Sequence, residues 1–131
     1  LFARREDTAL YSQAIDMERP RLFLLTKTTN STDYEEVLST TVSHDALGVS
    51  YFTLSVDPDP NALYQIIIGT IYNTAELEIR DIWTVELPHL TQGFYPGLGP
   101  GEAIIIRHRS KDPAITVETA LTLAFTEVVA K

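Results

Sequence analysis

The end of the chain, residues 115–131, has the clearest pattern in the sequence, because apolar and polar side chains alternate there at every second position. The apolar set is Ile115, Val117, Leu121, Leu123 and Phe125, and Thr116, Glu118, Ala120, Thr122 and Thr126 lie between them. A period of two is typical of a half-buried β-strand. Similar runs precede it, separated by Pro, Gly, Asp and Asn. The seven predicted strands are 21–28, 34–43, 51–56, 63–72, 75–87, 103–109 and 115–129.

No helical run of twelve residues follows Pro20, so the pattern predicts an all-β protein whose strands form an antiparallel sandwich, either a jelly roll or a Greek key. Residues 21–131 are predicted to be one domain. Alternation also predicts the inward-facing side chains: Phe52, Leu54 and Val56; Leu77, Ile79, Trp83, Val85 and Leu87; Ile104 and Ile106; Val117, Leu121, Leu123 and Phe125.

Residues 1–20 lack this alternation and are predicted to be an N-terminal segment distinct from the sandwich. It is either an extended arm or a short helix that begins at Asp7 or Thr8, runs through Met17 and is closed by Pro20. Further along, Asn73 and Thr74 are predicted to form a tight hairpin between the fourth and fifth runs.

Composition narrows the classes of partner. Cysteine is absent and the longest apolar stretch is far too short to cross a bilayer, which predicts a soluble protein with no membrane partner and no thiolate metal site. The net charge is −8, and residues 31–102 hold eleven acidic residues and one basic residue, Arg80. Nucleic acid needs a continuous positive face, so we expect no nucleic-acid partner and consider a basic protein surface more suitable.

Two features suggest contact surfaces. In the fourth run, Tyr64, Ile66, Ile68 and Tyr72 make the second face of the strand apolar as well. Either a loop or the N-terminal segment covers that face, or another subunit does. In the sixth run, Arg107 and Arg109 share one strand face and could clamp carboxylates of a partner or of the chain's own acidic block; the alternative is a solvated strand edge.

Catalytic patterns are weak. Ser43, His44 and Asp45 are the residue types of a hydrolase triad, but adjacent strand residues point to opposite faces and cannot meet. Paired carboxylates for glycoside hydrolysis could be drawn from Glu76, Glu78, Asp81 and Glu86. Among these, Asp81 falls on an apolar face and is expected to lie at a β-bulge or to need a buried partner. We therefore expect no catalytic residues and no enzyme.

Metal and cofactor sites are not predicted either. The three histidines, His44, His89 and His108, fall in separate segments without a ligand spacing. The spacing of Asp57, Asp59 and Asn61 is similar to that of a calcium loop, but prolines interrupt it and the Gly-x5-Glu continuation is missing.

The segment 93–101 holds four of the six glycines and is predicted to be a loop. With Trp83, its aromatic residues Phe94 and Tyr95 could form a stacking platform for a sugar, or they could cap the end of the core. The first possibility defines an alternative function, a ligand-binding β-sandwich such as a carbohydrate-binding module.

A small, acidic, cysteine-free β domain with a distinct N-terminal segment, a doubly apolar strand and separated charges resembles, in layout, the jelly-roll cement or decoration proteins of tailed phages. The resemblance implies a non-enzymatic virion structural protein on the capsid exterior. It would form dimers or trimers with itself, bind between subunits of the major capsid protein lattice and stabilise the shell. Arg4, Arg5, Arg19 and Arg21 would then meet acidic ground on a neighbour, and Tyr64, Ile66, Ile68 and Tyr72 would be buried against a partner.

Overall fold

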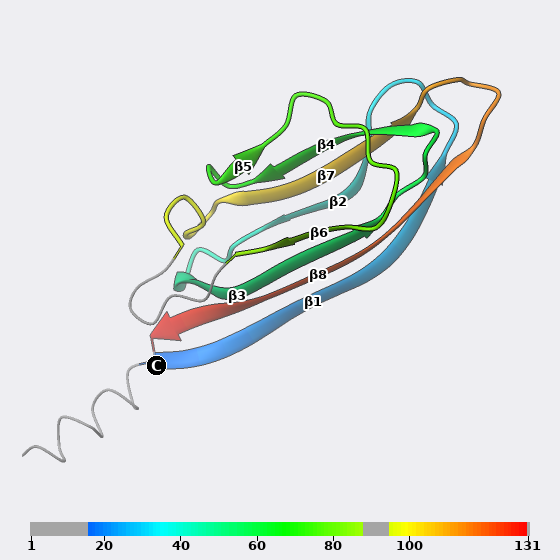
Figure 1. Cartoon of the computed structure of the whole chain (residues 1–131). Coiled ribbons are helices and arrows are strands. Elements are labelled where there is room, and N and C mark those ends of the chain that lie inside the picture. The colour runs from blue at the N-terminus through cyan, green and yellow to red at the C-terminus, as the bar shows by residue number, and fades with distance from the viewer. Residues whose placement is uncertain (1–15, 88–94, 131) are drawn as a thin grey trace, which may run out of the picture.

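The computed structural model describes residues 16–87 and 95–130, and these fold into eight antiparallel β-strands (Figure 1). The strands are β1 (Asp16–Thr29), β2 (Glu35–Thr41), β3 (Ala46–Asp57), β4 (Ala62–Ile68), β5 (Tyr72–Asn73), β6 (Trp83–Glu86), β7 (Ala103–Ser110) and β8 (Val117–Ala130). No helix occurs in the part of the chain that the structure describes. The prediction of an all-β sandwich is confirmed.

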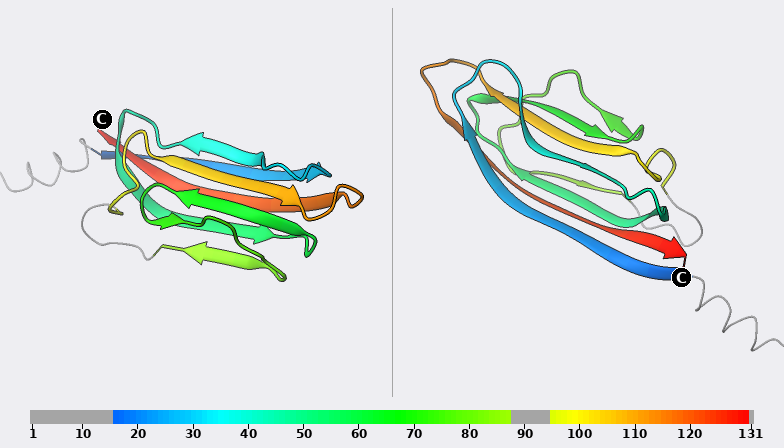
Figure 2. Two further views of the ribbon diagram at one scale, coloured as in Figure 1. Left: turned by 90° about the horizontal axis from the view of Figure 1, so that it is seen from above. Right: turned by 180° about the vertical axis from the view of Figure 1, so that it is seen from behind.

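Two four-stranded sheets make up the sandwich. Sheet A has the order β1-β8-β3-β6 and sheet B the order β2-β7-β4-β5. Pairing is nested: β1 pairs with β8, β2 with β7, β3 with β6 and β4 with β5. This is the jelly roll, one of the two predicted topologies. Figure 2 shows the sheets stacked with their strands roughly aligned.

The core lies between the sheets and is built by strand alternation. In β8 and β3, Leu123, Phe125, Phe52 and Leu54 point inward and are buried, and the rings of Phe52 and Phe125 stack at 6.3 Å between centroids. Sheet B contributes Ile66, Ile68, Ile104 and Ile106, all with no exposed surface. Each such side chain contributes roughly 1.5–3 kcal/mol before the loss of conformational entropy is subtracted. The predicted inward faces of these strands are confirmed.

A β-bulge in β3 sets which residues face outward. The register with β8 shifts between Ser50 and Thr53, and Tyr51 has a φ of 56° there. After the shift Thr53 lies opposite Ala124. A bulge of this kind moves a strand's side chains to the other face, so the odd-numbered residues 53, 55 and 57 point away from the core.

Strand β1 begins earlier than the sequence pattern predicts. Residues 16–20, which we assigned to the N-terminal segment, pair with β8 from Asp16 opposite Ala130, so a helix through Met17 is wrong at its end. Pro20 does not close a helix but lies in an edge strand, where its missing N–H need not interrupt the pairing with β8. Residues 1–15 lie outside the described residues, and the arm there stays a prediction.

The predicted fifth strand, 75–87, is also shorter in the structure. Only Trp83–Glu86 forms a strand, with a single bridge between Leu77 and Tyr64 before it, because the chain crosses from sheet B to sheet A in this segment. Asp81 is exposed in the irregular part, so it needs neither a bulge nor a buried partner. The turn after β4 lies at residues 69–71, not at Asn73 and Thr74, since Ile68 pairs with Tyr72.

Candidate functional site

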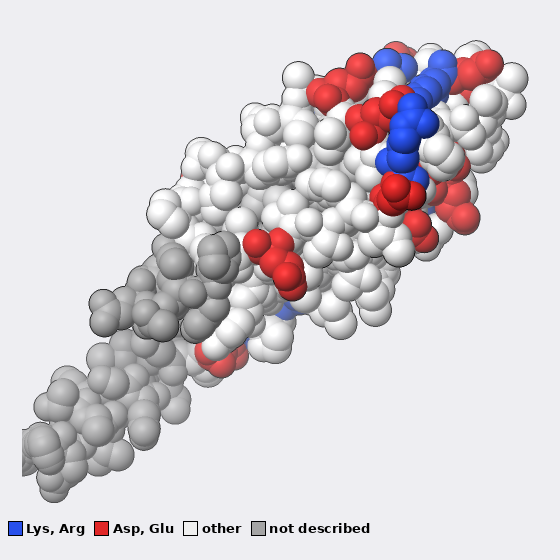
Figure 3. Space-filling model, in the orientation of Figure 1, with Lys and Arg blue, Asp and Glu red and all other residues white. Residues whose placement is uncertain are grey.

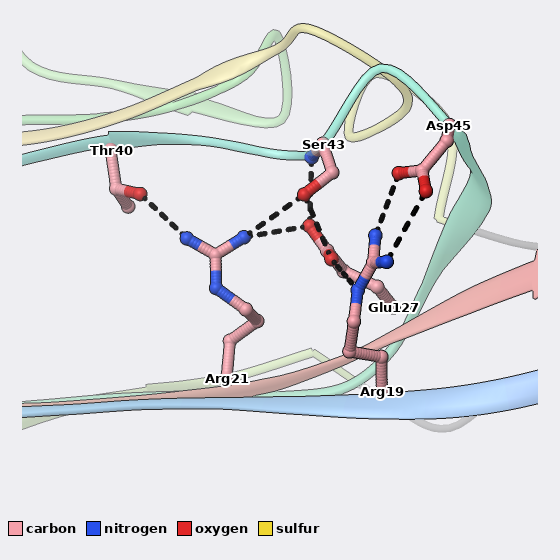
Figure 4. Close-up of polar contacts among 6 residues, drawn as sticks. All are labelled: Arg19, Arg21, Thr40, Ser43, Asp45 and Glu127. Carbon is pink, nitrogen blue, oxygen red and sulfur yellow. Dashed lines mark hydrogen bonds and ion pairs between the residues drawn. The ribbon is translucent and has the colours of Figure 1, made fainter.

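The predicted interface arginines of β1 point toward the chain's own carboxylate. Arg19 Nε lies 2.9 Å from Glu127 Oε1, and Arg21 Nη1 lies 2.9 Å from Glu127 Oε2 (Figure 4). The side chain of Glu127 has no exposed surface. Arg4 and Arg5 lie outside the described residues. Arg19 and Arg21 therefore form ion pairs within the chain itself. Arg19 also binds the exposed carboxylate of Asp45 at 2.7 Å.

Ser43, which follows β2, completes this cluster. Its backbone N–H donates to Glu127 Oε2 at 2.7 Å and its hydroxyl donates to Oε1 at 3.0 Å. Arg21 in addition donates to Thr40 Oγ1 of β2 at 3.1 Å. We call Arg19, Arg21, Ser43 and Glu127 the clasp, because they join sheet A to sheet B at the side where β1 and β2 are the edge strands (Figure 4).

The electrostatics of the clasp favour the ionised carboxylate. Burial by itself raises the pKa of Glu127, but hydrogen bonds from Ser43 and Arg19 and the charge of Arg21 outweigh it, so the pKa lies below its usual value. Arg19, between Asp45 and Glu127, has its pKa raised by their hydrogen bonds. The carboxylate is thus held charged and fully hydrogen bonded, which suits a fixed structural contact.

The apolar second face of β4 belongs to the core. Tyr64, Ile66 and Ile68 have no exposed surface, and Tyr72 is half-buried with its ring 5.7 Å from that of Trp83. The first three are therefore not available to a partner in the folded chain. These three residues lie in the core between the two sheets, which is neither of the explanations that the sequence left open, cover by a loop or the N-terminal segment or cover by another subunit.

The basic residues of β7 lie on the outer face of sheet B. Arg109 Nη2 is 3.1 Å from Glu76 Oε2, and its guanidinium lies 5.5 Å from the centre of the Tyr34 ring. Arg107 donates to Gln65 Oε1 at 3.3 Å. In the view of Figure 3, basic and acidic side chains gather together toward the end of the molecule that carries the β7–β8 loop. Arg109 is thus paired with the chain's own acidic block.

Trp83 and Tyr95, the two described residues of the stacking alternative, do not form a platform. Trp83 is half-buried against Tyr72, and Tyr95 is buried and donates its hydroxyl to the Leu87 carbonyl at 2.9 Å. Phe94 lies outside the described residues. Tyr95 therefore caps the core, which was the other possibility.

The weak catalytic and metal patterns have structural roles where the structure describes them. Ser43 and Asp45 serve the clasp, and Asp59 accepts hydrogen bonds from the backbones of Asn61 and Glu118 at 2.9 and 3.1 Å. His89 lies outside the described residues. Residues 16–87 and 95–130 contain no group of three or more His, Cys, Asp or Glu side chains placed to hold a metal ion. In the same ranges no helix is long and apolar enough to cross a membrane.

The side chain of His108 is buried in the core. Its Nδ1 lies 2.9 Å from Thr119 Oγ1, which is in turn 2.8 Å from the hydroxyl of Tyr64. The Tyr64 hydroxyl also accepts from the Asp59 backbone at 2.8 Å. Burial lowers the pKa of His108. Because His108 and Tyr64 lie in sheet B and Thr119 lies in sheet A, these hydrogen bonds form a core network that joins both sheets.

The candidate site that sequence reasoning missed is the outer face of sheet A. Its central rows follow from the register: Leu22, Ala124 and Thr53 lie side by side, and Leu24, Thr122 and Ser55 form the next row. We call these six residues the outer face. They carry no charge, and Leu22 and Leu24 are 62% and 69% exposed. The signal was present in the sequence, because leucines or phenylalanine occupy every position from 22 to 25.

An open groove of about 530 Å³ runs along this face. Leu24 lines one side and Ile82, which is 72% exposed, lines the other, with Ser55 and Thr122 between them. Leu22, Leu24 and Ile82 thus expose aliphatic side chains on the same side of sheet A, and exposed apolar surface that is contiguous marks contact sites in proteins.

No known protein family model matches the chain, and no curated protein matches its sequence. A chain of the structure of Triatoma virus is similar in structure over 86% of this chain and 65% of that one, with a TM-score of 0.42 and 9% identity. A family two carbohydrate esterase from Cellvibrio japonicus is similar over 88% of this chain and 36% of that one, with a TM-score of 0.39 and 19% identity. This chain spans less than two thirds of either, and neither similarity carries an argument about function.

Proposed function

We propose that this chain is a non-enzymatic structural protein of a virion, a cement or decoration protein that binds between capsid subunits and stabilises the shell. The observation that carries the proposal is the outer face of sheet A, which is uncharged and exposes Leu22 and Leu24. Within residues 16–87 and 95–130, no strand of the other sheet packs on this face. Burying this face against another protein would remove apolar surface from water.

Other features of the fold also favour a structural role over a catalytic one. The clasp and the core network use the polar side chains that could otherwise serve chemistry, and the exposed groove is open and not enclosed. Jelly rolls occur in viral capsids and also in lectins, so the fold class alone is an analogy and does not select between them.

The carbohydrate-binding alternative ranks second. Sugar stacking needs exposed ring faces, whereas Trp83 packs on Tyr72 and Tyr95 is buried. A glycan panel and insoluble polysaccharides test this alternative directly. Strong binding there by an isolated monomer would favour it.

The proposed function is tested by co-sedimentation with emptied tailed-phage shells that lack their decoration protein. We expect saturable binding at a fixed number of copies per shell and a higher melting temperature of the decorated shell. The variant Asp112→Asn, which alters an exposed loop residue that is not part of the outer face, serves as a binding-competent control. Wild-type protein that stays in the supernatant with every shell type contradicts the proposal.

A further inference from the structure

The charged side chains of β1, β8, β3 and β6 that strand alternation and register place on the outward side of sheet A are all acidic. By strand alternation and register, Glu18, Asp57, Glu86 and Glu118 project on this side of sheet A, and each is exposed. In the described part of the chain, the cationic side chains of β1 alternate to the other side, where Arg19 and Arg21 belong to the clasp. The uncharged outer face therefore lies among four carboxylates, which we call its acidic rim.

This rim disfavours a second copy as the occupant. Two copies that stacked these faces would bring four carboxylates toward four others, in a chain whose net charge is already −8. Like charges set against each other across an interface oppose binding to that partner. A partner with lysines or arginines around an uncharged centre would instead be complementary.

The size of the face suits a specific protein contact. Strands β1 and β8 have 14 residues each. Strand β3 has 12 residues and β6 has 4, so at about 3.3 Å per residue and about 4.8 Å between strands the outward side of sheet A has a projected area of roughly 700 Å². That is close to the surface of about 800 Å² that each partner buries in a standard protein interface.

We infer that the outer face of sheet A docks on a protein surface with an uncharged, partly aliphatic centre and a rim of lysine or arginine side chains. The inference rests on the proposed function, in which the partner is a capsid subunit, and it specifies the chemistry of that subunit's surface. Leu22 and Leu24 supply the apolar contact, and the four carboxylates supply the charge complementarity.

The test uses the full chain and a defined probe, without shells, so that its outcome is separate from that of the shell experiment. The probe is a planar sensor surface that carries methyl-terminated chains mixed with ammonium-terminated chains, and a second surface replaces ammonium by carboxylate. The double variant Leu22→Ser/Leu24→Ser is compared with Ile71→Ser/Ile115→Ser, which removes two exposed isoleucines elsewhere. Glu86→Gln/Glu118→Gln is compared with Glu35→Gln/Glu36→Gln, which makes the same charge change on sheet B.

We expect wild-type protein to bind the methyl/ammonium surface and not the methyl/carboxylate surface. Loss of both leucines should weaken binding by about tenfold or more, since each buried leucine contributes more than a tenfold factor in an ideal contact. Loss of Glu86 and Glu118 should weaken binding a few-fold and flatten its salt dependence, because screened charge pairs lose strength with salt. The two control variants should bind as the wild type does.

Three results would overturn the inference. The first is that the control variants weaken binding as much as the outer-face variants. The second is a preference for the methyl/carboxylate surface. The third comes from sedimentation velocity: a dimer that strengthens with salt and disappears in Leu22→Ser/Leu24→Ser would mean that a second copy covers the face.

Discussion

Arg21 and Glu127 are 106 residues apart in the sequence, yet Arg21 Nη1 lies 2.9 Å from the buried Oε2 of Glu127. The pair joins the first described strand to the last one. With Ser43 it also reaches the end of β2 in the opposite sheet. The sandwich is thus fastened at its β1–β2 side by a charged cluster and not by apolar packing alone.

Because the carboxylate of Glu127 is the centre of the clasp, we expect its removal to destabilise the fold strongly. Glu127→Ala should lower the free energy of unfolding by about 3–5 kcal/mol, because it leaves Arg19 and Arg21 without their shared partner and the Ser43 N–H unbonded. Urea unfolding followed by fluorescence of the single Trp measures it. Asp45→Asn is the control: Asp45 is exposed, so its loss should hardly move the midpoint. Equal midpoints for the two variants would mean that the clasp is not stabilising.

Acid should weaken the clasp. The folded-state pKa of Glu127 lies below its unfolded value, so its contribution is complete above the unfolded pKa of about 4.5 and disappears as the pH falls through the folded value. The difference in melting temperature between wild type and Glu127→Gln should therefore be constant near neutral pH and shrink below about pH 4.5. A difference that does not change down to about pH 2.5 would contradict this assignment.

His108 predicts a second pH effect at a higher pH. Burial lowers its folded-state pKa, while the charge of Glu35 acts to raise it and that of Lys27 to lower it. The folded state then binds fewer protons than the unfolded state. Stability should fall as the pH drops below the unfolded value of about 6.5, toward the folded pKa.

The measurement for His108 is the free energy of unfolding at about pH 7.5 and about pH 5.5. Wild type should lose stability between these values. His108→Gln, which keeps a polar side chain beside Thr119, should lose less over the same interval. If both proteins lose the same amount, another group is responsible for the pH dependence.

The turn after β4 predicts a backbone effect. Gly69 has a φ of 52°, and a Cβ placed there would lie 1.9 Å from the carbonyl oxygen of Gly97, which accepts a hydrogen bond from Thr70 N. Gly69→Ala should destabilise the fold by about 1–3 kcal/mol. Gly99→Ala is the matched control, since a Cβ at Gly99 meets nothing within 4 Å. Thermal unfolding of the two variants separates them, and equal melting temperatures would contradict the prediction.

The N-terminal segment gives a prediction for shell binding. Because β1 begins at Asp16, deletion of residues 1–15 removes Arg4 and Arg5 and leaves every described strand intact. The truncated chain should keep its melting temperature and lose most of its binding to emptied shells in the co-sedimentation experiment. Unchanged binding would mean that these residues play no part in attachment.

Alternation in the sequence predicted the inward faces of β3, β7 and β8, because apolar burial repeats every second residue in a strand. The same rule would have placed Glu127 and His108 inward, since they continue the faces of Phe125 and Ile106. They were missed because a polar residue at an inward position interrupts the alternation of apolar and polar side chains. Their burial depends on partners that only the folded chain supplies.

The local sequence pattern did not predict two other features, the turn after β4 and the outer face. The turn at residues 69–71 was missed because the prediction rested on Asn73 and Thr74, whereas Gly69, with its positive φ, marks the turn. The outer face depends on the register of β1, β8 and β3, in which Leu22, Ala124 and Thr53 become neighbours. Register between strands distant in sequence is set by the whole topology, so the face emerges only in three dimensions.

Nested strand pairing also has a consequence for how the molecule forms on the ribosome. Strand β1 is made first among the described strands, but its only ladder is with β8, which ends at Ala130. The hairpin of β4 and β5 can close early, whereas β1 must wait until nearly all of the described chain has emerged. Pairings between such distant segments make folding slow, so the pairing of β1 with β8 should be among the last steps in the folding of this domain.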